Sequence, residues 1–305
     1  MRHIHIISID DLTVCNLAVS LVQMGFNVTA SYSSLPAHAT SVLQEANLLP
    51  ECSGFDAAHI DKNIEVVVPT MSVTEENVEL QKAKELGLQI MSFPQFIYWL
   101  TKDKVRVVVS GSQGKNSILS MMLYALGKHK IAADYVALDP IKGYSSNIKL
   151  GTDGRIALLV SNEFPASHIE KRPFHHFYRP HIVVLPTLRW EESEEYPTEE
   201  SFLNSFKILT ERVERDGKCI YHEGEPLLDE LATELREDIT AIPFQRDLII
   251  EGDGKIYLKN RFGLFDINIK DEFFLQNLSA ARLACRQLGL QDKDFYAAIS
   301  EYSFL

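Results

Sequence analysis

The chain alternates between two patterns of apolar residues. Short continuous apolar runs predict strands buried on both faces, and segments with apolar positions every three or four residues predict amphipathic helices. The first unit is a strand at 3–9, a helix at 12–24 that stops at Gly25, and a strand at 26–30. Further strands are expected at 65–68, 88–91, 106–109, 132–138, 155–160, 182–185 and 218–221, and further helices at 36–46, 75–86, 118–126, 201–213, 226–235 and 274–288. This alternation predicts an α/β fold with a parallel, doubly wound sheet, followed by antiparallel strands between 248 and 269.

A polar break at residues 101–104 divides the chain. It separates the aromatic segment 93–100, which we interpret as core or interdomain packing, from the strand at 106–109. With 305 residues the chain is too long for one ordinary hydrophobic core. We therefore predict two domains, one at 1–103 and one at 104–305.

A glycine turn joins the strand at 106–109 to the helix that follows it. Its residues are Gly111, Ser112, Gln113, Gly114, Lys115, Asn116 and Ser117. In such a turn the glycines let the backbone approach an anion, the N–H groups and the positive end of the helix dipole face it, and the lysine neutralises charge. The turn therefore predicts a phosphate-binding loop. It is shorter between its glycines than a Walker A loop and has Asn116 where that loop has Ser or Thr, so an ordinary turn with an exposed lysine stays open.

Glu163 follows the strand at 155–160, and α/β folds place their chemistry at the carboxyl ends of parallel strands. It is the carboxylate best placed to serve a metal or a transferred group, and a solvated or helix-capping glutamate is the alternative. Four histidines come next, among Lys and Arg residues: His168, His175, His176 and His181. Because their spacing fits no helical pair and cationic neighbours disfavour a metal ion, we interpret this segment as a surface loop that leads into a strand.

The first turn of the chain lacks the glycines that a dinucleotide or nucleotide-sugar domain would place there. Ser8, Asp10, Asp11 and Asn16 occupy it, and two carboxylates would repel a pyrophosphate. The fold signal is thus present without the binding signal. We interpret the two aspartates as helix-capping residues, with a metal or acid–base pair as the alternative.

Composition limits the class of partner. The net charge of -12 argues against binding to nucleic acid or to an anionic membrane, since both need a basic field. No apolar run approaches membrane-spanning length, and the beginning of the chain is too short and too soon acidic for a secretory signal. Cys15, Cys52, Cys219 and Cys285 form no CxxC pair, so we interpret them as buried thiols in a reducing cytoplasm.

End to end, the sequence resembles the first two domains of the Mur ligases, which join amino acids or peptides to UDP-N-acetylmuramate in peptidoglycan synthesis and recycling. The murein peptide ligase branch is most similar, followed by the UDP-N-acetylmuramate–alanine ligases. The family's ATP loop, Gly-Thr-x-Gly-Lys-Thr-Thr, has the short glycine spacing of residues 111–117. Residues 276–281 resemble a helix whose asparagine contacts the adenine. A further segment of the branch is matched by Lys171, Arg172, Tyr178, Arg179 and Pro180.

The resemblance implies a Rossmann-like first domain and a P-loop-type second domain, with ATP and Mg²⁺ as cofactors and a UDP-N-acetylmuramate-type precursor as ligand. It implies that Lys115 and Glu163 are catalytic and that the glycine turn and Asn277 bind ATP. The Mg²⁺ ligands would be Asn116, Ser117, Glu163 and Glu192, the last standing where the family has a metal-binding histidine. Thr70, Ser72 and Asn77 resemble a polar turn of the family that helps to hold the sugar nucleotide. Strand-end capping is the alternative.

Several positions depart from the family's motifs. Residues 8–11 stand where the family has its glycine loop for the uridine nucleotide, and Val160 stands where it has the leading Glu of an acidic motif. An Asp-His pair of the family is replaced by Glu191 and Glu192, and a His near the adenine helix is replaced by Phe273. The chain stops where the family's third domain, which binds the incoming amino acid, would begin. We therefore expect a Mur-ligase-like protein without full ligase activity that binds a nucleotide, a precursor or a protein partner. An active ATP-dependent ligase completed by another chain is the alternative.

Overall fold

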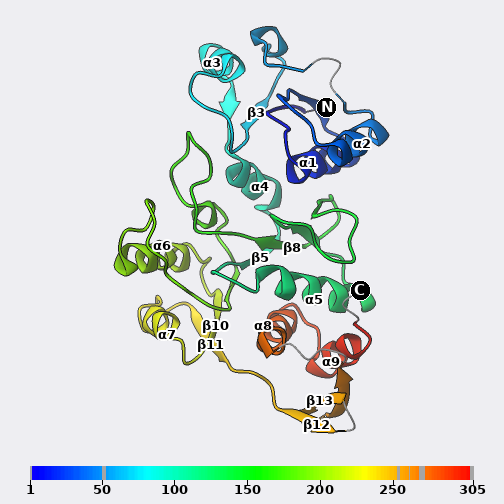
Figure 1. Ribbon diagram of the computed structural model, residues 1–305, viewed down its shortest axis with the longest axis vertical. Coiled ribbons are helices and arrows are strands. Elements are labelled where there is room, and N and C mark those ends of the chain that lie inside the picture. The colour runs from blue at the N-terminus through cyan, green and yellow to red at the C-terminus, as the bar shows by residue number, and fades with distance from the viewer. Residues whose placement is uncertain (1, 50–52, 253–254, 261, 268–271, 303–305) are drawn as a thin grey trace.

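The computed structural model describes residues 2–49, 53–252, 255–260, 262–267 and 272–302. Three β-sheets follow one another along the longest dimension of the molecule (Figure 1). In this view the first sheet is at the top, the large second sheet is in the middle, and a small third sheet is at the bottom.

The first sheet has four parallel strands in the order β2-β1-β3-β4. It opens with β1 (His3–Ile7), α1 (Leu12–Gln23) and β2 (Asn27–Ala30), the β-α-β unit that the sequence predicts. The remaining elements are α2 (Ala37–Glu45), the 3₁₀ helix η1 (Ala57–His59), β3 (Val66–Pro69), α3 (Val78–Glu85), β4 (Gln89–Ile90) and α4 (Phe93–Thr101). Every residue of β3 is buried, as its apolar, β-branched run predicts for an inner parallel strand.

The second sheet has seven strands in the order β11-β10-β9-β5-β8-β6-β7, parallel except for β7. They are β5 (Val105–Val109), β6 (Asp134–Val136), β7 (Ile148–Lys149), β8 (Ile156–Val160), β9 (Ile182–Leu185), β10 (Lys218–His222) and β11 (Thr240–Phe244). The helices are α5 (Lys115–Lys128), the 3₁₀ helix η2 (Phe174–Phe177), α6 (Glu199–Glu211), α7 (Pro226–Thr233), α8 (Glu272–Gln287) and α9 (Asp292–Ser300). The third sheet is the predicted antiparallel one, made of β12 (Ile249–Gly252), β13 (Lys255–Asn260) and β14 (Gly263–Ile267).

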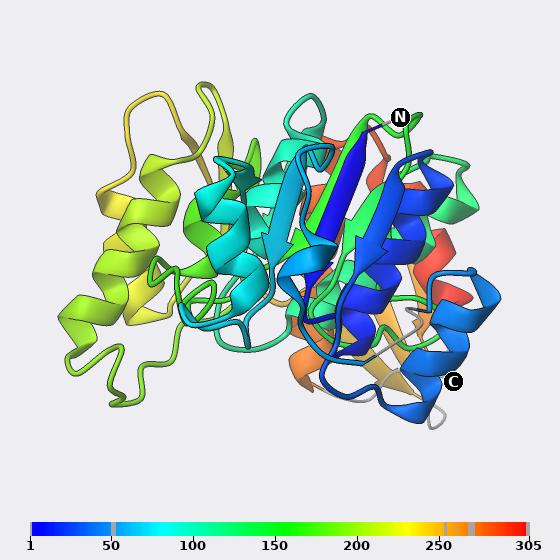
Figure 2. The ribbon, with the colours of Figure 1, turned by 90° about the horizontal axis from the view of Figure 1, so that it is seen from above.

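Helices cover both faces of the second sheet. Val107 and Val109 belong to one core with α5, α8 and α9, whereas Val108 between them belongs to a core with α1 and α4. Towards the other edge, α6 and α7 cover Val183 and Leu185. Figure 2 shows these two helices on one side of the molecule, away from α1 and α2. The doubly wound sheet predicted from the sequence is confirmed.

The first and second sheets share a buried core. Ile4 and Leu17 of the first half lie in the same apolar cluster as Leu159 of the second, and all three are fully buried. Asn16 on α1 donates a hydrogen bond of 2.7 Å to Asn147 beside β7. The aromatic segment 93–100 contributes to this core, which agrees with the packing role predicted for it. The division of the chain into domains 1–103 and 104–305 stays a prediction.

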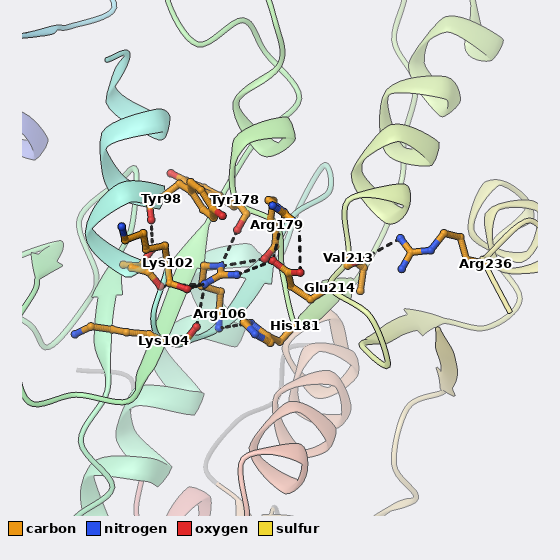
Figure 3. A network of polar contacts seen from close by, with 11 residues as sticks. Tyr98, Lys102, Lys104, Arg106, Tyr178, Arg179, His181, Val213, Glu214 and Arg236 are labelled. Carbon is orange, nitrogen blue, oxygen red and sulfur yellow. Dashed lines mark hydrogen bonds and ion pairs between the residues drawn. The ribbon is translucent and has the colours of Figure 1, made fainter. Parts of the chain in front are cut away.

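Arg106 ties the polar break at 101–104 to the second sheet (Figure 3). Its guanidinium is buried and forms an ion pair of 3.1 Å with Glu214. Five carbonyls accept hydrogen bonds of 2.6 to 3.1 Å from its Nε and Nη1 atoms, those of Thr101, Lys102, Lys104, Tyr178 and Arg179. Because so many acceptors converge on one buried cation, the link between the halves is held in place.

Strands β7 and β11 and helix α9 are among the elements that were not predicted from the sequence. Strand β7 lies inside the Gly-, Ser- and Asn-rich stretch 143–154, and only its pairing with β6 defines it. Strand β11 contains Pro243 and is an edge strand, where the missing N–H of proline is tolerated. Helix α9 follows α8 after Gly289. No helix in the described ranges is long and apolar enough to cross a membrane.

The cysteines within the described residues are buried free thiols, as predicted. They are Cys15, Cys219 and Cys285, and burial raises the pKa of each. Cys52 lies outside the described residues.

Candidate functional site

The glycine turn lies at the carboxyl end of β5 and leads directly into α5. Gly111 has a φ of +126° and Gly114 a φ of +85°, values that favour glycine. A Cβ atom on Gly111 would lie 2.6 Å from the carbonyl oxygen of Thr187, and one on Gly114 would lie 2.6 Å from Oδ1 of Asn277. Both glycines are therefore required by close approach as well as by backbone angle.

Helix α5 begins without a side-chain cap. Its first intrahelical bond runs from the N–H of Ile118 to the carbonyl of Gly114, and in the described chain the N–H groups of residues 115–117 have no acceptor. Three free N–H groups at the positive end of a fourteen-residue helix suit an anion.

Lys115 folds back over the turn, and its Nζ donates a hydrogen bond to the carbonyl of Gly111. Burial lowers the pKa of Lys115, whereas the nearby carboxylates of Glu163 and Asp139 act in the opposite direction. The structure therefore brings the predicted lysine and the predicted carboxylate Glu163 into electrostatic contact at the loop.

Glu163 lies just beyond β8, the strand next to β5, and is 8% exposed. Its Oε2 is buried and has no hydrogen-bond partner among the described residues. Burial raises the pKa of Glu163, and Lys115 counteracts part of this effect. A buried carboxylate oxygen without a partner is costly, so Glu163 fits a ligand-binding role better than the solvated or capping alternative.

Other polar atoms around the turn share this property. Within the described part of the chain, Oδ1 of Asn116, Oγ1 of Thr187 and both amide atoms of Asn277 are buried without a hydrogen-bond partner. Asn277, on α8, is fully buried against Gly114. The structure thus brings Asn277 to the glycine turn, and the adenine contact implied by resemblance stays a prediction.

A buried polar chain supports the site from behind. His175 Nδ1 is 3.1 Å from the hydroxyl of Ser110, next to the turn, and Nε2 is 2.8 Å from the hydroxyl of Ser205. The hydroxyl of Tyr196 donates to the carbonyl of Glu163 and lies 3.1 Å from Ser205. This chain connects the beginning of the turn to the backbone of the candidate carboxylate.

The surface loop predicted for the histidine segment is therefore wrong for His175 and His176, which are buried in η2. His176 Nε2 is 2.8 Å from the carbonyl of Ser205. His181 Nδ1 accepts from the N–H of Arg106, and His168 is exposed. Local composition suggested a loop, but Phe174, Phe177 and Tyr178 draw this segment into the core.

The first-half candidates lie at the end of the first sheet. Asp11 is the N-cap of α1, as predicted. Thr70 donates to the carbonyl of Ser8, and the hydroxyl of Ser72 is 2.8 Å from that of Ser8. Asn77 is the N-cap of α3. Asp11 and Asn77 thus make local capping bonds, whereas the contacts of Thr70 and Ser72 join the carboxyl end of β3 to that of β1. The sugar-nucleotide role of Thr70, Ser72 and Asn77 stays a prediction.

Glu192 is exposed in the loop after β9. The beginning of this loop contacts the glycine turn, since the N–H of Ser112 donates to Thr187 at 2.9 Å and that of Arg189 donates to the Ser112 hydroxyl at 2.8 Å. No contact of Glu192 with the turn is present in the described chain, so its role as a Mg²⁺ ligand stays a prediction.

The residues present fit the phosphates of a nucleotide and, in part, a magnesium ion. The turn supplies free N–H groups and a lysine, and the unpartnered Oδ1 of Asn116 and Oε2 of Glu163 are hard oxygens of the kind that Mg²⁺ takes. No three His, Cys, Asp or Glu side chains come together as a metal site in the ranges described. A magnesium site would therefore combine Glu163 with amide, hydroxyl and phosphate oxygens.

The sequence reasoning missed Asp139 and Thr187. Asp139 follows β6, and its Oδ2 is 3.3 Å from Nδ2 of Asn116. It could have been found by the argument applied to Glu163, because it too lies beyond the carboxyl end of a parallel strand. Thr187 had no comparable signal, since its role depends on the backbone contact with the turn.

Comparison with known proteins relates the chain to cell-wall ligases. The sequence matches no established family profile. It is 21% identical over 315 residues to the UDP-N-acetylmuramate–L-alanine ligase of Syntrophomonas wolfei, covering 99% of this chain and 66% of that protein. It is 25% identical over 298 residues to the ligase of the same name from Persephonella marina, covering 95% and 62%. The chain thus spans slightly less than two thirds of the length of these curated relatives.

Solved structures agree on the fold. The UDP-N-acetylmuramate:L-alanyl-γ-D-glutamyl-meso-diaminopimelate ligase of Neisseria meningitides superposes with a TM-score of 0.88 at 18% identity, over 100% of this chain and 99% of that chain. A murein peptide ligase of Psychrobacter arcticus gives 0.84 at 18% identity, over 100% and 69%. The fold is therefore that of the Mur ligases.

A parallel α/β sheet with a glycine turn before α5 defines the class of protein, an α/β protein with a candidate phosphate-binding loop. The sequence matches, which run through almost the whole chain, make it similar to UDP-N-acetylmuramate–L-alanine ligases, and its fold is shared with solved Mur ligase structures. The family resemblance predicted from the sequence is confirmed.

Proposed function

We propose that this protein is a Mur-ligase-like, nucleotide-binding protein that holds ATP and Mg²⁺ at residues 111–117 and lacks full ligase activity. Its relatives named above are ligases that act on UDP-N-acetylmuramate. The observation that carries the proposal is the glycine turn at the head of α5, with three free N–H groups, a covering lysine and buried unpartnered oxygens around it.

Each element of the turn has a defined part in this binding. The N–H groups of residues 115–117 would hold phosphate oxygens, and Lys115 would exchange its bond to the Gly111 carbonyl for a stronger one to a phosphate. Asn116 and Glu163 would hold Mg²⁺ through oxygens that are now unpartnered. When bound, ATP would supply a transferable phosphoryl group. Holding these oxygens in line is most of what a protein contributes to such chemistry.

Two observations support reduced ligase activity. Glu192, which stands where the family has a metal-binding histidine, is exposed and makes no contact with the turn within the described residues. In the first half, Asp10 and Asp11 occupy the turn where the family has its glycine loop for the uridine nucleotide. The first change would remove a metal ligand, and the second would weaken the binding of an anionic substrate in the first half.

Calorimetric titration with a non-hydrolysable ATP analogue and Mg²⁺ tests the proposal. We expect micromolar affinity for the wild type and a loss of at least about tenfold in Lys115→Ala, because a charged hydrogen bond to phosphate is removed. Lys128→Ala is the matched control, since Lys128 lies at the other end of the same helix and pairs with Glu301. Absence of binding in the wild type, or equal affinity in Lys115→Ala, would refute the proposal and leave a scaffold or partner-binding role.

An active ligase completed by another chain is the second candidate. The retained Glu163, buried beside Lys115, favours it because a phosphoryl-transfer site needs this carboxylate. Release of phosphate from ATP, measured with UDP-N-acetylmuramate and an amino acid present, distinguishes the two. Turnover that disappears in Glu163→Gln would establish the ligase, whereas binding without turnover would support the non-catalytic protein.

A further inference from the structure

The third sheet ends in an edge strand that no other described strand covers. In the order β12-β13-β14, β12 pairs with β13 alone, and Figure 1 shows β12 at the lower end of the molecule. Its four residues include no proline and no lysine, two residues with which natural proteins block such edges. The strand is therefore open to pairing with another chain.

The ladder between β12 and β13 shows which backbone groups face outwards. The N–H of Lys259 donates to the carbonyl of Leu248 at 3.0 Å, so these residues form a hydrogen-bonded pair at the beginning of the ladder. Hydrogen-bonded pairs alternate with non-hydrogen-bonded pairs in antiparallel strands, and Ile249 and Glu251 belong to the second kind. Their N–H and carbonyl groups therefore point away from β13, and no residue of the described chain bonds to them.

One face of this sheet carries exposed apolar side chains. Leu248 is 75% exposed and Ile250 is 40% exposed, and alternation along the strand puts both on the same face. Leu264 on β14 joins them and is 55% exposed, since Lys259 stands opposite both Leu264 and Leu248. Ile249 lies on the other face, where it packs against the core that contains α8 and α9. Exposed apolar side chains gathered at an open sheet edge are typical of an interaction surface.

The edge is complementary to itself about a two-fold axis at Ile250. In an antiparallel pair centred there, Ile249 of each copy stands opposite Glu251 of the other, and their outward N–H and carbonyl groups form four hydrogen bonds. Each Leu248 stands opposite Gly252, which has no side chain to obstruct it, and the two Ile250 side chains meet at the axis. An axis at Glu251 would instead place two carboxylates opposite each other, which disfavours that register.

We propose that β12 is the pairing surface of a symmetric dimer, in which two copies of this chain join their third sheets into one antiparallel sheet of six strands. The partner is a second copy because backbone groups, apolar side chains and charge all match in the same two-fold register. The net charge of -12 disfavours contact between copies over most of the surface, whereas β12 contributes only one charged side chain. The proposal goes beyond nucleotide binding at residues 111–117 and does not depend on it.

Sedimentation velocity over a range of protein concentrations measures the dimer. We expect a dissociation constant of about 10–100 µM for the wild type, because the contact is smaller than a standard protein interface. Ile250→Lys should weaken the dimer at least about tenfold, since two ammonium groups then stand opposite each other at the axis. Leu264→Lys is the matched control, because it adds the same charge to the same face on the far strand, and it should leave the dissociation constant unchanged.

Disulfide formation locates the axis. Ile250→Cys places two thiols in a non-hydrogen-bonded pair with Cα atoms about 4.5 Å apart, within the range of about 4.4–6.8 Å that a disulfide spans. Leu264→Cys places the two thiols more than about 20 Å apart, since five strand spacings separate the two copies of β14. Under mild oxidation we expect a covalent, reducible dimer for Ile250→Cys and none for Leu264→Cys or the wild type.

Several outcomes would overturn the proposal. A wild type that stays monomeric well above the expected dissociation constant would leave the edge to a different protein or to no partner. Equal weakening by the two lysine variants would show that the dimer does not use β12. A wild-type dimer without a disulfide in Ile250→Cys, or with one that forms as readily in Leu264→Cys, would place the axis elsewhere. The wild-type measurement needs no variant, so it tests the dimer even if a variant fails to fold.

Discussion

Gly114→Ala tests whether Asn277 locks the glycine turn in place. Gly114 has a φ of +85°, and a Cβ atom there would lie 2.6, 2.7 and 2.9 Å from Oδ1, Nδ2 and Cγ of Asn277. Asn277 is fully buried, so its amide would have to shift within the core to make room. The substitution therefore adds steric overlap to backbone strain.

Gly25 offers a matched comparison that separates the two effects. Its φ is +86°, almost the same as that of Gly114, and a Cβ atom on it would meet nothing within 4 Å. Alanine in the left-handed region costs about 1–2 kcal/mol at either position. Overpacking against buried atoms adds about 1–3 kcal/mol at Gly114 only. We expect Gly25→Ala to lose about 1–2 kcal/mol of unfolding free energy and Gly114→Ala about 2–5 kcal/mol.

Urea denaturation followed by circular dichroism measures both losses. The double variant Gly114→Ala/Asn277→Ala should recover the excess, because removal of the amide leaves room for the new methyl group. Removing a buried amide that has no partner should itself cost little. Equal losses in the two glycine variants, or no recovery in the double variant, would show that Asn277 moves aside freely and does not lock the turn.

Two further predictions concern buried polar groups. Arg106→Met should lower the unfolding free energy by about 3–5 kcal/mol, because Glu214 and five carbonyls lose a buried cation. Arg236→Met removes a more exposed ion pair with Asp238 and hydrogen bonds to the carbonyls of Glu211 and Val213, so it should lose less than Arg106→Met, and equal losses would contradict the reasoning. Burial, with His176 and Lys115 nearby, lowers the pKa of His175 well below its usual range. Below about pH 6.5 the unfolded state therefore binds a proton that the folded state does not. The unfolding free energy should decrease as the pH is lowered, by up to about 1.4 kcal/mol per pH unit. His175→Gln should remove that contribution, and an unchanged slope in denaturation between pH 7.5 and 5.5 would contradict it.

The glycine turn shows what could be predicted from local sequence. A β-branched run, two glycines with a lysine, and apolar residues at helical spacing lie within one short stretch, and each acts on its immediate neighbours. The same holds for Asp11, whose capping bond reaches only three residues along the chain. Such features depend on backbone sterics and on hydrogen bonds between residues close in the chain, so they can be predicted from the sequence.

The histidine segment shows where this reasoning failed. Its Lys, Arg and His residues suggested an exposed loop, but three aromatic neighbours bury His175 and His176 in η2. Charge and composition describe a segment by itself, whereas burial depends on which surface it meets. That surface, formed by Ser110 and Ser205, comes from distant parts of the chain.

By itself, the sequence determined most of the order of strands and helices, the glycine turn and the Mur ligase resemblance. Periodicity, glycine spacing and motifs each depend on residues close together in the chain. Only the tertiary structure decided that Asn277 and Thr187 lie against the two glycines, and that the carboxylates of Asp139 and Glu163 lie near Lys115. It also decided that a cavity with Asp11 in its wall lies between the sheets. These neighbours are set by strand order and by the packing of helices on both faces of the sheet. No local pattern specifies either, since the residues involved meet only when their burial in a common core brings them together.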